Sequence, residues 1–303
     1  MGATSAELEK WGMRMRYLLG VLASIAVLAS SPAAAEEVIG LVGSTSIVTF
    51  DSASPGTITS SRIITGLGAG VTLTGIDLRP ADNQLYSVSS TGTVYRLTLS
   101  GANYTATSLG TISTSPSGTS FGLDFNPTVD RIRMVSDTDQ NLRINQTTTP
   151  PGVTVDTAIT LDASSNVDLI GSAYTNSVFG ATTTTLFGID AFTDALVRST
   201  NPNGGLYTNV GPLGLSLGAT DLLGFDISGF SGAGFFSVNN NFYGVNLATG
   251  GATLIGGLGA QGITGITIAA VPEPGTWAMM LLGFAGVGVA LRRRRPAMLR
   301  QAA

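Results

Sequence analysis

The sequence contains no cysteine and no histidine. Without cysteine the fold cannot use disulfide bonds. Nucleophilic sites of the Ser-His-Asp or Cys-His type are excluded as well, and so are zinc sites made from histidine or cysteine. Any catalysis by this chain would have to use carboxylates, arginine, tyrosine, serine or an oxygen-bound metal.

Basic residues are scarce in the central part of the chain. Residues 36–271 contain seven arginines, no lysine and sixteen acidic residues, so their net charge is −9. No basic stripe is present to replace the counterions of phosphate groups, which excludes nucleic acid as a partner. The two tryptophans, Trp11 and Trp277, also lie outside this region. An acidic surface favours solubility and attracts cations instead.

The N-terminal segment has the three parts of a secretory signal. Two arginines precede an apolar run at 18–29, and an A-x-A site follows at Ala33 and Ala35. The run of twelve residues is short for a bilayer span, although a retained membrane anchor is the alternative. We therefore predict a signal peptide at 1–35, used by the Sec-type export machinery and cleaved after Ala35.

Residues 1–12 add nothing to this signal, so translation could begin at Met13 or Met15.

A proline-flanked motif, an apolar segment and an arginine cluster follow one another near the C-terminus. The apolar segment, 275–291, is 17 residues long and would measure about 25 Å as a helix. We predict that it forms a transmembrane helix whose arginines stay on the cytoplasmic side. The residues that define this tail are Pro272, Glu273, Pro274, Trp277, Arg292, Arg293, Arg294 and Arg295.

This tail, residues 271–303, resembles the PEP-CTERM sorting signal of Gram-negative bacteria that make extracellular polysaccharide. The resemblance implies an exosortase, a membrane protease that removes the helix near the Pro-Glu-Pro motif. It also implies transient anchoring in the inner membrane, followed by delivery to the cell surface or the extracellular space. An ordinary C-terminal anchor is the alternative, because apolar spans with positive flanks are common.

A short motif recurs in the region between these two segments. An apolar residue, a glycine, a second apolar residue and often an aspartate repeat with glycine spacings of 47, 49, 53 and 41 residues. Runs with period-2 alternation, bounded by Gly, Asn, Asp and Pro, follow each motif and predict short antiparallel strands. The repeated glycines are Gly75, Gly122, Gly171, Gly224 and Gly265.

About four strands per repeat of this length is typical of a propeller blade. We predict an all-β, propeller-like domain at 36–270 with about five four-stranded blades. Four blades are continuous and the fifth combines 262–269 with N-terminal strands in 38–64, which would leave no free sheet edge. A β-sandwich is the alternative fold. The continuous blades are expected at 71–112, 119–161, 168–212 and 221–257.

The stretch 122–145 is long and distinctive, and it resembles the family called domain of unknown function 4394, found in exported bacterial proteins. Shorter matches include 74–80 and 185–190, and the resemblance covers nearly all of 38–270. Asp139 departs from it, because a glycine is expected there. The resemblance implies the fold and export, and it supplies no catalytic residue.

Three aspartates, Asp77, Asp124 and Asp226, occupy the same position in three repeats. In a propeller they could line one end of the channel and bind a cation or sugar hydroxyls. The favoured interpretation is that each accepts backbone N–H bonds in its own turn. In the other two repeats, Ala173 and Thr267 stand at the position of the aspartate.

One repeat also concentrates residues of opposite charge. They could form an anionic-ligand or uronic-acid site, although an ion-pair network between blades is the favoured interpretation. The candidate cluster is Asp124, Asn126, Asp130, Arg131, Arg133, Asp137, Asn141 and Arg143. In the same repeat, Asp137, Asp139 and Asn141 resemble the opening of a calcium loop, but the glycine and the closing glutamate of that loop are missing.

The sequence thus leaves three functions open. The first is a non-enzymatic domain that binds or scaffolds extracellular matrix, with polysaccharide as the expected partner and no cofactor required. The second is an enzyme of polysaccharide or phosphoester chemistry that uses carboxylates, arginine and calcium. The third is a protein–protein interaction module.

Overall fold

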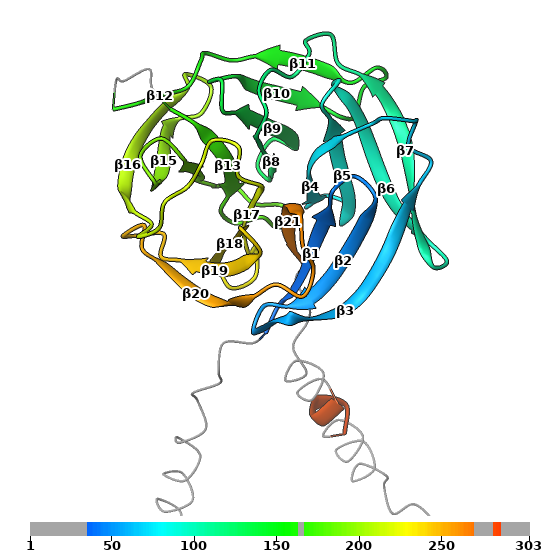
Figure 1. The fold of residues 1–303 in the computed structure, drawn as a ribbon. Helices are drawn as coiled ribbons and strands as arrows, with labels where there is room; N and C mark the ends of the chain where they lie inside the picture. The colour runs from blue at the N-terminus through cyan, green and yellow to red at the C-terminus, as the bar shows by residue number, and fades with distance from the viewer. Residues whose placement is uncertain (1–34, 163–166, 270–280, 286–303) are drawn as a thin grey trace, which may run out of the picture. The chain divides into compact units, whose positions relative to one another are not determined.

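The computed structural model describes residues 35–162, 167–269 and 281–285 of the chain. Its folded part is built from sheets that surround a central axis (Figure 1), and all but two of their strand pairs are antiparallel. The all-β, propeller-like architecture predicted from the repeat is confirmed.

Four of the blades are continuous in the sequence, and in each the chain runs from the innermost strand outward. The first contains β4 (Leu73–Arg79), β5 (Gln84–Ser89), β6 (Thr93–Ser100) and β7 (Asn103–Thr111); the second contains β8 (Phe121–Asn126), β9 (Arg131–Ser136), β10 (Asn141–Asn145) and β11 (Gly152–Val155). The third contains β13 (Leu169–Tyr174), β14 (Leu186–Asp190), β15 (Ala195–Asn201) and β16 (Leu206–Pro212), with the two-residue β12 (Thr160–Leu161) beside β16; the fourth contains β17 (Leu223–Ile227), β18 (Gly234–Val238), β19 (Asn241–Val245) and β20 (Ala252–Gly257).

The fifth blade joins the two ends of the domain. Its innermost strand is β21 (Ile263–Ala269), which pairs with β1 (Glu37–Val42), followed outward by β2 (Ser46–Asp51) and β3 (Ser54–Thr65). In the β1–β21 register Glu37 lies opposite Ala269. The first and last strands of the domain are therefore held side by side by backbone hydrogen bonds.

The hydrophobic cores lie between neighbouring blades. Because side chains along a strand alternate between the two faces of the sheet, one strand contributes to the cores on both sides of its blade. On β5, Tyr86 and Val88 pack with Phe125 and Ile132 of the next blade. Leu85, which points the other way, joins the core that contains Leu41 of the preceding blade. Successive side chains of a strand point to opposite faces, so the middle strands of each blade are buried on both.

The innermost strands form a closed ring in the order β4, β8, β13, β17 and β21, and β21 also contacts β4. This ring surrounds the central axis of the domain (Figure 1). Because equivalent positions of the repeat lie at equal heights on these strands, each repeated residue type forms its own layer around the channel.

Among the described residues, no helix has both the length and the apolar character needed to cross a membrane. Residues 281–285 are helical. The rest of the predicted span 275–291 lies outside the described residues, as do the sorting motif and its arginine cluster.

Candidate functional site

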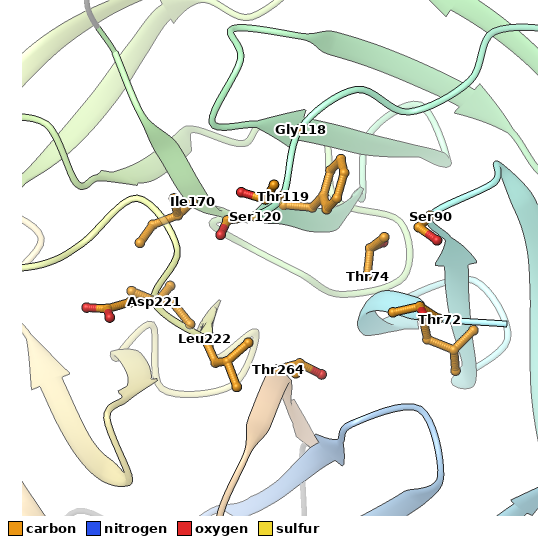
Figure 2. A pocket seen from close by; sticks show the side chains of 13 residues that line it. Thr72, Thr74, Ser90, Gly118, Thr119, Ser120, Ile170, Asp221, Leu222 and Thr264 are labelled. Atoms are coloured by element: carbon orange, nitrogen blue, oxygen red, sulfur yellow. The ribbon is translucent and has the colours of Figure 1, made fainter. Parts of the chain in front are cut away.

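The channel opens to solvent at the end where the innermost strands begin. A cavity of about 180 Å³ lies there. Figure 2 shows hydroxyl-bearing side chains around it, together with Ile170 and Leu222. Thr72 and Ser90 are exposed and Ser120 is half-buried, so their hydroxyls are accessible to a ligand. The innermost strands contribute one equivalent residue each: Thr74, Phe121, Ile170, Leu223 and Thr264.

One step deeper, the five repeated glycines close the channel. A Cβ atom on Gly122 would lie 2.5 Å from the backbone nitrogen of Ser172, and one on Gly224 would lie 2.5 Å from that of Ile266. Real Cβ atoms do not approach backbone this closely, so glycine is required where the innermost strands of two blades touch. Only about 10 Å³ remains open between them, about the least space that a single water molecule needs, so a ligand cannot pass. The mouth cavity is therefore a blind cup.

Beyond the glycines lies a layer of polar side chains that link each innermost strand to the next. Asp77 Oδ2 accepts a hydrogen bond from the Phe125 backbone N–H at 2.7 Å. Asp124 Oδ1 accepts one from Tyr174 N–H at 3.2 Å. Asp226 Oδ2 accepts one from Ile268 N–H at 2.6 Å. Each aspartate thus ties its blade to the following one.

Thr267 occupies the equivalent position on β21, where the sequence has no aspartate, and it makes the same kind of bond to the next strand. Its hydroxyl donates to Asp77 Oδ1 at 2.8 Å and accepts from Leu78 N–H at 3.3 Å. The bond to Leu78 joins β21 to β4 in the same way as the aspartates join their strands. At the fifth position, Ala173 offers no such bond. Asp77 and Asp226 also accept the N–H of the residue that follows each of them on the same strand.

The three aspartates are buried close to one another. Carboxylate oxygens of Asp77, Asp124 and Asp226 all lie within 4.8 Å of each other. Burial, followed by the nearby negative charge of Glu36, raises the pKa of Asp226 to about 6. Burial also raises the pKa of Asp77, with Asp226 adding to the effect, and that of Asp124, with Asp77 adding to it. Such a group of oxygens could hold a cation or share protons.

Arg133 is the centre of a separate buried network. The side chain is 1% exposed. Its Nη1 donates to Asn141 Oδ1 and to Asp156 Oδ2, both at 2.7 Å, and its Nη2 donates to Asn203 Oδ1 at 2.8 Å. Arg143 completes the pairing of Asp156, with Nη2 3.0 Å from Oδ1. The network joins the second blade to the third, because Asn203 lies between β15 and β16.

The other members of the candidate cluster lie elsewhere. Asp130 accepts two hydrogen bonds from Arg79 of the preceding blade, at 2.7 and 2.5 Å, and this guanidinium holds the pKa of Asp130 below its ordinary value. Arg131 bonds only to nearby backbone carbonyls. Asn126 accepts from Thr128 in its own turn. The cluster does not converge on one open site.

The three residues of the suggested calcium loop are also separated in their bonding. Asp137 accepts hydrogen bonds from the backbone N–H of Thr119 at 2.9 Å and from its hydroxyl at 2.5 Å. Asn141 turns its oxygen to Arg133. Asp139 adopts a left-handed φ of 62°, the conformation that the glycine expected at this position favours. Among the described residues, the structure assembles carboxylates at the channel and not in this loop.

The predicted cleavage sites lie at the edge of the described chain. Ala35 is exposed and Glu36 is buried. Ala33 and the sorting residues 272–274, 277 and 292–295 lie outside the described residues.

Two family models match the chain. The model described as domain of unknown function (DUF4394) matches residues 46–267. The PEP-CTERM protein-sorting motif matches residues 270–295. No curated protein matches the chain.

Several solved structures are similar at low identity. A Bacteroides thetaiotaomicron protein of unknown function is 14% identical with a TM-score of 0.46; the match covers 74% of this chain and 58% of that one. A Myxococcus xanthus glutaminyl cyclase is 11% identical with a TM-score of 0.40, covering 64% and 77% of the two chains. A putative 6-phosphogluconolactonase from Bacteroides uniformis is 13% identical with a TM-score of 0.38, covering 77% and 71%.

Proposed function

Because the chain belongs to the family of domain of unknown function 4394 and carries a PEP-CTERM sorting motif, we propose that it is a cell-surface or matrix protein with a non-enzymatic binding domain. The observation that carries this proposal is the sorting motif at 270–295, which begins directly after β21. Such a motif marks a protein for export and for sorting to the surface or the extracellular space.

The route of delivery follows from the two ends. The signal peptide 1–35 is removed after Ala35, and the helix 275–291 anchors the chain transiently in the inner membrane. Exosortase then cuts near Pro272–Pro274 and releases the domain. The pairing of Glu37 with Ala269 supports this route, because β1 begins beside the residue at which β21 ends.

The ligand that suits the mouth cavity is a neutral polysaccharide. Accessible hydroxyls of Thr72, Ser90 and Ser120 surround apolar groups of Phe121 and Leu222, and small polar groups on an apolar wall are the usual composition of a ligand site. The volume of about 180 Å³ is small, so it favours one sugar unit of a longer chain. An anionic sugar is disfavoured, since Arg133 and Arg143 are committed to Asp156.

A non-enzymatic role is supported by the residues that line the mouth cavity, because they include no pair of groups that could act as acid and base. Its one carboxylate, Asp221, already accepts bonds from the Gly218 backbone N–H at 2.9 Å and from Asn239 Nδ2 at 3.3 Å. The buried carboxylates lie on the far side of the glycine layer. No acid and base pair therefore faces a ligand bound in the cup.

The test is titration of the exported protein with neutral oligosaccharides, followed by NMR. We expect weak, saturable binding, and the variant Ser90→Trp should weaken it at least tenfold because the indole would cover the mouth. Ser61→Trp, on the exposed outer strand β3, is the matched control and should bind normally. Equal affinity of both variants, or cleavage of the glycan, would contradict the proposal.

A further inference from the structure

The end of the propeller opposite the mouth carries exposed apolar side chains at the tips of its turns. We call this end the carboxylate face; it consists of the turns 80–83, 127–130, 175–185 and 228–233, which follow the innermost strands. Phe179 is 80% exposed and Phe230 is 55% exposed, and Val129 and Val178 are exposed as well. Exposed apolar groups that gather on one face mark an interaction surface.

The tips of the third and fourth blades are in contact. A Cβ atom on Gly229 would lie 2.3 Å from the Ser177 carbonyl oxygen and 3.1 Å from a methyl carbon of Val178. The turns that carry Phe179 and Phe230 therefore touch, and we call these two neighbouring turns the apolar patch.

Much of the charge near this patch is buried or paired. The Glu36 carboxylate is buried and accepts hydrogen bonds from the hydroxyls of Ser228 and Ser231. Farther round the face, Arg79 pairs with both Asp82 and Asp130. The charge that remains exposed at this end is acidic, at Glu37, so an apolar patch here suits a neutral, partly apolar partner better than an anionic one.

The chain itself fixes which partner this face meets. Ala269, the last residue of β21, lies opposite Glu37 at this end of the domain. Only five residues, 270–274, separate it from the apolar segment that starts at Gly275. Five extended residues reach at most roughly 17 Å. While the tail is in the membrane, Ala269 at this end of the domain therefore stays within roughly 17 Å of the start of the apolar segment.

We propose that the carboxylate face rests on the lipid surface while the precursor is anchored, with Phe179 and Phe230 inserted at the interface. This inference rests on the proposed anchoring by the tail. Two aromatic side chains alone bind a bilayer weakly, but the tether raises their effective concentration. The mouth cavity, at the opposite end, then faces away from the membrane and stays open to ligand before release.

The absence of cysteine allows a clean test. Single-cysteine variants Phe179→Cys and Phe230→Cys of the signal-cleaved protein with its intact tail are labelled with a fluorophore and reconstituted in phosphatidylcholine vesicles. Phe192→Cys is the matched control, because Phe192 is 57% exposed in the turn after β14, at the mouth end. Nitroxide-bearing lipids then quench fluorophores that touch the bilayer.

We expect at least threefold stronger quenching at positions 179 and 230 than at 192. Equal quenching at all three positions in protein that floats with the vesicles would overturn the orientation alone. A shift at position 179 that depends on protein density, without lipid quenching, would assign the face to a second copy and also overturn it. Failure of the protein to float with vesicles would contradict the proposed anchoring, and this inference with it.

Discussion

Replacing Gly122 with alanine is expected to destabilise the domain by about 3 kcal/mol, near the upper end of what overpacking costs. The added methyl group would lie 2.5 Å from the Ser172 nitrogen and 2.6 Å from the Gly171 carbonyl carbon. Both are backbone atoms of the next innermost strand, so no side chain can turn aside. The ring must open at this point, and the layers above and below it are disturbed together.

Thermal unfolding measures this effect, and a decrease in Tm of roughly 6–12 °C is expected for a domain of this size. Gly257→Ala is the matched control, since a Cβ atom there meets nothing within 4 Å. Gly257 is also in a strand, β20, but at the outside of its blade. Similar Tm values for the two variants would mean that the innermost strands are not in contact.

Replacing Arg133 with methionine is expected to cost about 3–5 kcal/mol, the range for breaking a buried ion pair by removing one partner. Asp156 would keep only Arg143, and the oxygens of Asn141 and Asn203 would lose their buried donor. Methionine fills much of the same space. The decrease in stability would therefore come mainly from the lost hydrogen bonds and charge pairing, and less from a cavity.

Urea unfolding compares this variant with Arg131→Ala. Arg131 lies two residues away on the same strand and bonds only to the carbonyl oxygens of Val129 and Asp130, so its loss should change stability by less than about 0.5 kcal/mol. If Arg133→Met were equally mild, the buried network would not stabilise the junction between the second and third blades.

The repeat of glycine and aspartate was sufficient to predict the propeller-like fold and the pairing of its two ends. Spacing and alternation are local properties, and each repeat carries them in full. The strand partner of β1 followed from the need to leave no open edge. The predicted helix at 275–291 has no counterpart in the described residues apart from 281–285.

The bonding of the aspartates was less visible in the sequence. Asp favours N–H groups in its own turn, and this preference does not reveal that the innermost strands approach closely enough for Asp124 to reach Tyr174, 50 residues away. Thr267 looked like a break in the series because it is no acid. Its hydroxyl nevertheless makes the same bond. The sequence feature that indicates this bond is a polar residue at this position, whether or not it is an acid.

The Arg133 network shows a second limit. Two of its partners, Asp156 and Asn203, stand 23 and 70 residues from Arg133, and neither belongs to a motif. The sequence grouped charges that are near in the chain, whereas the structure pairs Arg133 and Arg143 with Asp156 at the end of β11 and links Arg133 to Asn203 of the third blade. The mouth cavity was missed for a related reason: its five strand residues share a position, but only Thr74 and Thr264 share a residue type.

The central claim is that two transport segments are removed from one closed β domain, and intact mass spectrometry of the exported protein tests it most directly. In cells with exosortase, the account predicts an N-terminus at Glu36 and loss of residues 275–303. In cells without exosortase, the same N-terminus should occur with the tail intact to Ala303. A tail that remains uncut in exosortase-competent cells would contradict the account.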